Sequence, residues 1–181
     1  MAGSTTQTRR SLRLRDYDYA QPGAYFVTVC AYRQQHTFGT IDGEKTSLND
    51  YGLIVRDEWL KTGTLRPGIQ LDEYVIMPSH LHGIIVIPPS TEEGTARRAP
   101  TPEAFGRPVP GSIPTIVRSF KSAVTRRVCE EAGGQRIAVW QRGFYDHIIR
   151  TEADLHRIRG YIRTNPLALS LKSVAEDTSG V

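Results

Sequence analysis

The segment that most limits how this chain can fold is 80–87, in which two histidines open an otherwise apolar run, HLHGIIVI. An apolar run of this length that follows the turn residues Met77-Pro78-Ser79 is typical of a central strand covered on at least one face. Successive side chains of a strand point to opposite faces. His80 and His82 are therefore predicted to lie side by side, while Leu81 between them packs into the core.

Paired imidazoles on one rigid face can hold a divalent cation, because each neutral ring offers one nitrogen lone pair. Histidine pairs on strands are also often structural or incidental, and the spacing of His80 and His82 fits either interpretation. The choice depends on which other side chains the fold brings to this strand.

The composition is that of an ordinary globular protein, with 181 residues, 39% hydrophobic and 23% charged. This length favours one domain with a substantial core. No apolar run reaches the length of a membrane span, and the polar start of the chain lacks the apolar core of a signal peptide. We therefore expect an intracellular protein. Cys30 and Cys129 form no CxxC pair and are expected to be reduced, buried thiols.

The distribution of basic residues favours an anionic partner, in keeping with the net charge of +4. Arginines gather at the N-terminus, on one predicted helix and near the C-terminus, and the planar guanidinium suits phosphate. A solvated basic surface explains the same distribution equally well. The residues that could contact phosphates of such a partner are Arg9, Arg10, Arg13, Arg15, Arg118, Lys121, Arg126 and Arg127.

Hydrophobic patterning predicts a β(β)αββαβα order of elements. Ser47 and Asn49 are candidate caps for the first helix, and Pro166 is predicted to end the third. The economical solution is an α+β sandwich, in which helices pack on an antiparallel or mixed sheet. The predicted strands are 24–32, 38–45, 69–76, 80–87, 137–141 and 144–150, and the predicted helices end near 62, 132 and 165.

We expect the chain to divide into a basic N-terminal arm (1–20), a single domain (21–172) and a polar tail (173–181). Within the domain, residues 88–111 are rich in proline and small polar residues, and they are predicted to form a flexible surface loop.

The third predicted helix carries Tyr161 and Asn165, which share one helical face because they are four residues apart. Beside them, Leu155, Ile158 and Ile162 form an apolar stripe that would hold the helix on the sheet. A phenol and an amide oxygen could then face a metal ion bound by the histidines. The same spacing fits a half-buried tyrosine and an asparagine that ends the helix.

Three motifs occur in one order: Met77-Pro-Ser-His-Leu-His-Gly83, Val139-Trp-Gln-Arg-Gly-Phe-Tyr-Asp-His147 and Tyr161-Ile-Arg-Thr-Asn-Pro166. Together with the 14–32 segment, they resemble the single-tyrosine HUH transposases, most closely the REP-associated tyrosine transposases. The resemblance covers about 13–169. Ser79 departs from it mildly, because relatives often carry Asn or Asp at that position.

The resemblance implies a ferredoxin-like (RRM-like) antiparallel sheet with helices packed on one face and the histidine motif on a central strand. It implies that His80, His82 and Asn165 are metal ligands and that Tyr161 is the nucleophile. The implied cofactor is Mg²⁺ or Mn²⁺, although imidazoles would also accept Ni²⁺ or Zn²⁺. The implied reaction cleaves single-stranded DNA near a hairpin and leaves a 5′-phosphotyrosine and a free 3′-OH.

The implied partner is single-stranded or hairpin DNA in the bacterial cytoplasm, at the nucleoid, and the protein would act as a monomer or a homodimer. The sequence does not decide whether Tyr161 serves its own histidines or those of a second copy. Two alternatives stay open: a domesticated hairpin-binding protein without turnover, and a metal-dependent phosphohydrolase that activates water. His147 could be structural or could contact DNA, and Tyr145 could be a core residue or a platform on which a base stacks.

Overall fold

The computed structural model describes residues 17–43, 45–89 and 109–178. The predicted order of elements is confirmed, and the short second strand is in fact a hairpin of two strands. The elements are β1 (Gly23–Cys30), the 3-10 turn η1 (Tyr32–Gln34), β2 (Gly39–Asp42), β3 (Lys45–Leu48), α1 (Asp50–Thr64), β4 (Gln70–Met77), β5 (His80–Ile87), α2 (Ile113–Glu131), β6 (Tyr145–Ile149) and α3 (Glu152–Thr178).

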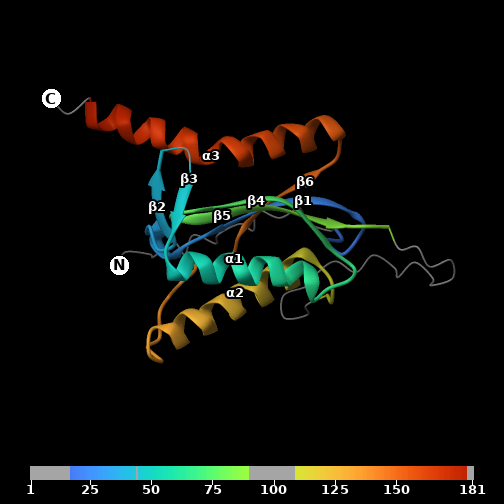
Figure 1. The fold of residues 1–181 in the computed structure, drawn as a ribbon. Coiled ribbons are helices and arrows are strands. Elements are labelled where there is room, and N and C mark those ends of the chain that lie inside the picture. Colours follow the sequence, from blue (N-terminus) through green and yellow to red (C-terminus); the bar gives the residue numbers. More distant parts are fainter. Residues whose placement is uncertain (1–16, 44, 90–108, 179–181) are drawn as a thin grey trace, which may run out of the picture.

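The main sheet has four strands in the order β4-β5-β1-β6, and every neighbouring pair is antiparallel. This order, with α1 between β1 and β4 and α2 between β5 and β6, is the ferredoxin-like arrangement. The predicted fold class is therefore confirmed, and the two histidines lie on a central strand. The β2–β3 hairpin forms a separate two-stranded sheet that stands beside the main one (Figure 1).

Helices α1 and α2 cover one face of the sheet (Figure 1). Leu81 and Ile85 of β5 point to this side, where they join a large buried cluster with Trp59 of α1 and Phe120 of α2. Gly83 lies directly beneath the Trp59 ring, and a Cβ atom at this position would overlap the indole. The glycine that follows the histidines is thus required by the packing of Trp59.

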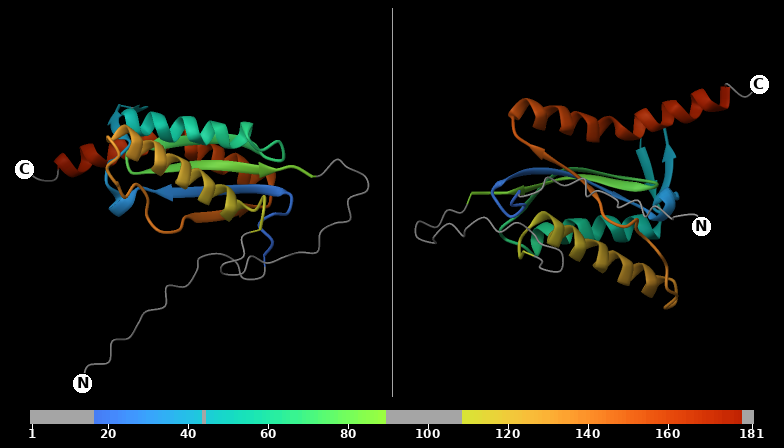
Figure 2. Two further views of the ribbon diagram at one scale, coloured as in Figure 1. Left: turned by 90° about the horizontal axis from the view of Figure 1, so that it is seen from below. Right: turned by 180° about the vertical axis from the view of Figure 1, so that it is seen from behind.

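Helix α3 covers the opposite face, as Figure 1 and the second view in Figure 2 show. Ile158 and Ile162 of α3 form a second buried cluster with Ile84 of β5 and Ile149 of β6. The expectation of helices on one face therefore holds for α1 and α2 but is wrong for α3. The physical reason is that the central strands are apolar on both faces, so each face has to be covered.

The start of α3 agrees with the prediction, because the Thr151 hydroxyl accepts a hydrogen bond from the Asp154 amide at 3.1 Å. Its predicted end is wrong, since α3 continues past Pro166 to Thr178. Proline removes one backbone hydrogen bond and bends a helix without always ending it. The Pro166 ring is buried, which offsets part of that cost, and α3 changes direction along its length (Figure 1).

The helix caps follow simple side-chain chemistry. Asn49 caps α1 by accepting from the Gly52 amide at 3.0 Å, and Ser112 caps α2. The other candidate cap, Ser47, lies in β3. Leu53 and Leu60 of α1 are exposed, because the helix faces the sheet through Ile54, Val55 and Trp59.

Three further predictions concern the strand 137–141, the N-terminal arm and the long loop. The predicted strand 137–141 is reduced to a single bridge between Ala31 and Trp140. The arm residues Arg9, Arg10, Arg13 and Arg15, and most of the loop 88–111, lie outside the described residues. Among the residues that the structure describes, no helix combines the length and apolar character needed to cross a bilayer.

Candidate functional site

The site is built on the face of the sheet that α3 covers. Strand pairing aligns Val75 of β4, His82 of β5, Thr28 of β1 and Tyr145 of β6 in one transverse row. Directly paired residues of antiparallel strands lie on the same face, so this row places polar and aromatic groups together. The next row contains Ile84, Phe26 and His147.

The predicted proximity of the two histidines is confirmed, because the rings of His80 and His82 lie with their centroids 4.5 Å apart. Each ring has a hydroxyl partner at Nδ1. Thr28 Oγ1 lies 2.8 Å from Nδ1 of His82, and Ser79 Oγ lies 3.1 Å from Nδ1 of His80. When these hydroxyls accept the Nδ1 protons, both Nε2 atoms are left with a lone pair.

Tyr161 of α3 reaches His80 and His82 from the side of the sheet that α3 covers. Its hydroxyl lies 3.2 Å from Nε2 of His82, and the two ring centroids are 5.2 Å apart. Phe26 stacks on His82 at 5.3 Å and meets the Tyr161 ring edge-on at 6.2 Å. The phenol is held by aromatic contacts on one side, yet 48% of Tyr161 is exposed, so its oxygen is accessible to a large substrate.

Burial controls the charge of the two histidines. It lowers the pKa of His82 to about 3, with a smaller contribution from the neighbouring His80, and it also lowers the pKa of His80. Both rings are therefore neutral at physiological pH. Neutral imidazoles are the form that binds metal ions and accepts hydrogen bonds.

Asn165 lies one helical turn beyond Tyr161 and is half-buried. No hydrogen bond joins its amide to either histidine in the described part of the chain. Among the same residues, no group of three or more His, Cys, Asp or Glu side chains could hold a metal ion. A cation here would depend on the two imidazoles, with its other ligands taken from Asn165, water or substrate.

Comparison with solved structures shows the same fold in a known protein. The structure of a REP-associated tyrosine transposase bound to a REP hairpin has a TM-score of 0.56 and 22% sequence identity, over 87% of this chain and 74% of that chain. No family model matches the chain.

Two curated proteins of Haemophilus influenzae are similar in sequence. An uncharacterized protein is 38% identical over 162 residues, which are 88% of this chain and 88% of that protein. A protein named "Putative REP-associated tyrosine transposase" is 27% identical over 160 residues, 88% of this chain and 79% of that protein. The chain is thus similar in sequence to a protein named as a putative REP-associated tyrosine transposase, and it shares the fold of a solved REP-associated tyrosine transposase.

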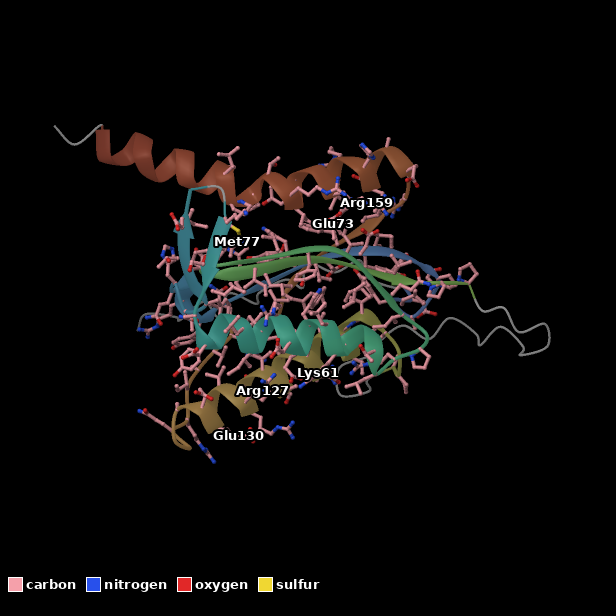
Figure 3. The ribbon with its side chains drawn as sticks, viewed as in Figure 1. Lys61, Glu73, Met77, Arg127, Glu130 and Arg159 are labelled. Carbon is pink, nitrogen blue, oxygen red and sulfur yellow. The ribbon has the colours of Figure 1, made fainter. Side chains whose placement is uncertain are left out.

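Two of the predicted DNA contacts on α2 have internal partners. The Lys121 ammonium donates to the carbonyls of Gln141 and Gly143, at 2.7 and 2.8 Å. Arg127, labelled on α2 in Figure 3, pairs with Glu58 of α1 at 2.9 Å. Because α2 also lies on the face away from Tyr161, we do not include Lys121 and Arg127 in a DNA interface.

The remaining predicted contacts on α2 differ in their surroundings. Arg126 is largely exposed and, among the described residues, pairs with Glu130 at 3.9 Å. Its contact with phosphate, and that of Arg118, stays a prediction, although both share with Lys121 and Arg127 the helix that lies away from Tyr161. Two residues of the site, Thr28 and Phe26, were not predicted. Both lie in β1, and only the register between β1 and β5 brings them to His82. Phe26 and Thr28 are two positions apart in the predicted strand 24–32 and therefore share one face of it, and this spacing was the signal that the sequence offered.

Proposed function

We propose that this protein is a metal-dependent nuclease and strand transferase of single-stranded DNA, acting near a hairpin through a covalent link to Tyr161. The observation that carries the proposal is the 3.2 Å pairing of the Tyr161 hydroxyl with Nε2 of His82 in one chain. The sequence similarity to a putative REP-associated tyrosine transposase and the net charge of +4 support an anionic substrate.

The residues fit a divalent cation in their chemistry. Two neutral imidazoles lie side by side, and with Nδ1 of each engaged by a hydroxyl, their Nε2 atoms are the available donors. His80 and His82 would hold the cation, with Asn165 as a third ligand. When bound, Mg²⁺ or Mn²⁺ supplies orientation of the scissile phosphate and offsets its negative charge.

Tyr161 is the proposed nucleophile. Its oxygen forms a bond to the phosphorus, the bond from phosphorus to the 3′ oxygen breaks, and the 3′ oxygen ends as a hydroxyl while the phenol proton is released. A free phenol has a pKa near 10, so it needs assistance at neutral pH. The pKa of His82, about 3, is too low for this ring to take the proton efficiently. Its hydrogen bond positions the phenol before a cation binds, and because Nε2 has a single lone pair, a bound cation would take the place of that hydrogen bond.

The product link keeps the energy of the phosphodiester bond. A 3′-OH of another DNA end can attack the phosphotyrosine, re-form a phosphodiester and regenerate Tyr161, so strand transfer needs no nucleotide cofactor. The solved relative is described with a REP hairpin, and we infer that a comparable hairpin is the substrate here.

The decisive experiment incubates the protein with Mn²⁺ and labelled single-stranded DNA that carries a hairpin. The wild-type protein should form a covalent adduct, and Tyr161→Phe should form none while still binding the hairpin. Tyr51→Phe, on α1 at the other face of the sheet, is the matched control and should form the adduct normally.

The outcomes separate the competing functions. Cleavage that survives in Tyr161→Phe would identify a phosphohydrolase that activates water. Tight hairpin binding, with no cleavage in the presence of any of several divalent metal ions, would identify a DNA-binding protein without turnover. His80→Ala should abolish cleavage and leave hairpin binding within a few-fold, whereas an equal loss of both would argue against a chiefly catalytic metal.

A further inference from the structure

We propose that Asp72 and Glu73 of β4 are positioning residues that hold the tyrosine helix over the histidine strand of the same chain. This inference rests on the proposed function, in which Tyr161 is the nucleophile. It concerns two acidic residues that contact neither the phenol nor the imidazoles. Figure 3 shows Glu73 and Arg159 between α3 and the sheet.

Both acidic residues form ion pairs with α3. Asp72 accepts from Nε of Arg159 at 3.1 Å and from Nη2 at 2.6 Å, and Glu73 accepts from Nε of Arg163 at 3.0 Å. The Asp72 and Arg159 side chains are 19% and 31% exposed, so this pair is shielded from solvent on most sides. Shielded, bidentate pairs constrain geometry better than single surface contacts.

A bulge in β4 explains how two consecutive residues can reach the same helix. Leu71 pairs with Ile85 and Tyr74 pairs with Gly83, so Asp72 and Glu73 together stand opposite the single residue Ile84. In a regular strand their side chains would point to opposite faces. A bulge changes the direction of side chains, and here both carboxylates bond to arginines of α3.

The spacing on α3 divides the helix surface into three adjacent columns. Arg159 and Arg163 form one column, Ile158 and Ile162 form the middle one, and Tyr161 lies on the far side of the isoleucines. The arginines bond to β4, the isoleucines pack on Ile84 and Ile149, and Tyr161 reaches His82. The ion pairs thus set the rotation of α3, which the apolar contacts alone leave looser because they are non-directional.

The same contacts assign Tyr161 to its own chain. Only Arg150 and Thr151 separate β6 from α3, so the helix has to start beside its own sheet. The partners of both arginines, and His82 itself, belong to that sheet. We infer that Tyr161 acts with the histidines of its own chain.

The positioning role is first tested without DNA or metal. In the double variant Asp72→Asn/Glu73→Gln, backbone hydrogen exchange over 155–165 should increase at least several-fold. Glu130→Gln, which removes an exposed carboxylate on the other face of the sheet, should leave it unchanged. Unchanged protection in the double variant would overturn the proposal.

The second test uses the covalent adduct. The double variant should bind hairpin DNA within about two-fold of wild type but form the adduct about 10- to 100-fold more slowly, since small displacements of a reacting group cost this much. The charge exchange Asp72→Arg/Arg159→Asp should recover part of the rate that Asp72→Arg alone loses. A rate equal to wild type in the double variant, or no recovery by the exchange, would contradict the positioning role.

A mixing experiment tests the assignment to one chain. Tyr161→Phe and His82→Ala should each be inactive, and their mixture should stay inactive, because neither chain carries a complete site. Recovery of adduct formation in the mixture would show that the tyrosine serves a second copy and would overturn this part of the proposal. If the wild-type protein forms no adduct at all, the proposed function fails. The hydrogen-exchange measurement, which needs neither DNA nor metal, still tests the positioning role by itself.

Discussion

The Tyr161 hydroxyl lies 3.2 Å from Nε2 of His82, although the two residues are 79 positions apart in the chain. The other nitrogen of the same ring lies 2.8 Å from the Thr28 hydroxyl. One imidazole therefore joins the first strand to the last helix, and its orientation is fixed from both sides. The reactivity proposed for Tyr161 depends on this ring being held in one position and one tautomer.

Thr28→Val should impair the site without unfolding the protein, because it replaces the hydroxyl at Nδ1 of His82 with a methyl group of similar size. Outer partners of metal-binding histidines typically contribute about 10- to 100-fold in metal affinity or activity. We expect a loss of this size in Mn²⁺ affinity, measured by calorimetry, and in the rate of adduct formation.

The conservative variant Thr28→Ser retains the hydroxyl and should keep most of the Mn²⁺ affinity. If Thr28→Val and Thr28→Ser bind Mn²⁺ as tightly as the wild-type protein, the hydroxyl has no role in orienting His82.

Two glycine-to-alanine substitutions should act in opposite directions. Gly83→Ala places a methyl group against the buried Trp59 ring and should destabilise the fold by about 1–3 kcal/mol, as overpacking of a core does. Gly160 lies inside α3, and a Cβ there would meet no heavy atom within 4 Å among the described residues. Gly160→Ala should raise stability by about 0.5–1 kcal/mol. Urea unfolding of both variants measures the contrast, and equal effects would refute the packing argument for Gly83.

Much of the fold could be predicted because its signals are local. The apolar run at 80–87 and the cap at Asn49 each depend on residues only a few positions apart. The same local reasoning placed Tyr161 beside the stripe of Ile158 and Ile162, and both isoleucines are buried in the structure.

The parts that could not be predicted depend on pairing between distant segments. Nothing in the sequence of β4 marks the bulge at Asp72 and Glu73, and the partner of Arg159 is 87 positions away. Thr28 likewise reaches His82 only through strand register. The rule that proline ends a helix failed at Pro166 because tertiary burial outweighed the local preference.

Arg127 should stabilise the fold, because it pairs with the buried carboxylate of Glu58 at 2.9 Å. Lys61 pairs with the same carboxylate. Burial raises the pKa of Glu58, but the hydrogen bonds from Lys61 and Arg127 outweigh this effect, and the pKa is lowered. A carboxylate whose folded pKa lies below its unfolded value stabilises the protein above the unfolded pKa. That stabilisation is lost as the pH falls through the folded pKa.

Arg127→Met should therefore cost about 2 kcal/mol at pH 7, where Glu58 is charged, and clearly less at a pH below the folded pKa of Glu58, where the carboxyl is protonated. Denaturant unfolding at the two pH values measures the difference. The neighbouring Arg126→Met, which removes an exposed arginine, should leave stability nearly unchanged. A cost in Arg127→Met that is the same at both pH values would show that the ion pair is not its cause.

Tyr145 should bind a base of the DNA strand next to the site. It lies in the same row as Thr28 and His82 on the site face of the sheet. Because 53% of Tyr145 is exposed, it is not a core residue, and the other alternative that the sequence left open applies. Stacking of a base on an aromatic ring contributes about 1–3 kcal/mol. Tyr145→Ala should weaken the binding of single-stranded DNA by that amount in fluorescence anisotropy, and Tyr145→Phe should not, because it keeps the ring.

Leu65→Ala, which removes an exposed apolar side chain at the end of α1, is the control for a general loss of surface contact. If Tyr145→Phe weakens binding as much as Tyr145→Ala does, the hydroxyl is what contacts the DNA, and the strand does not stack on this ring.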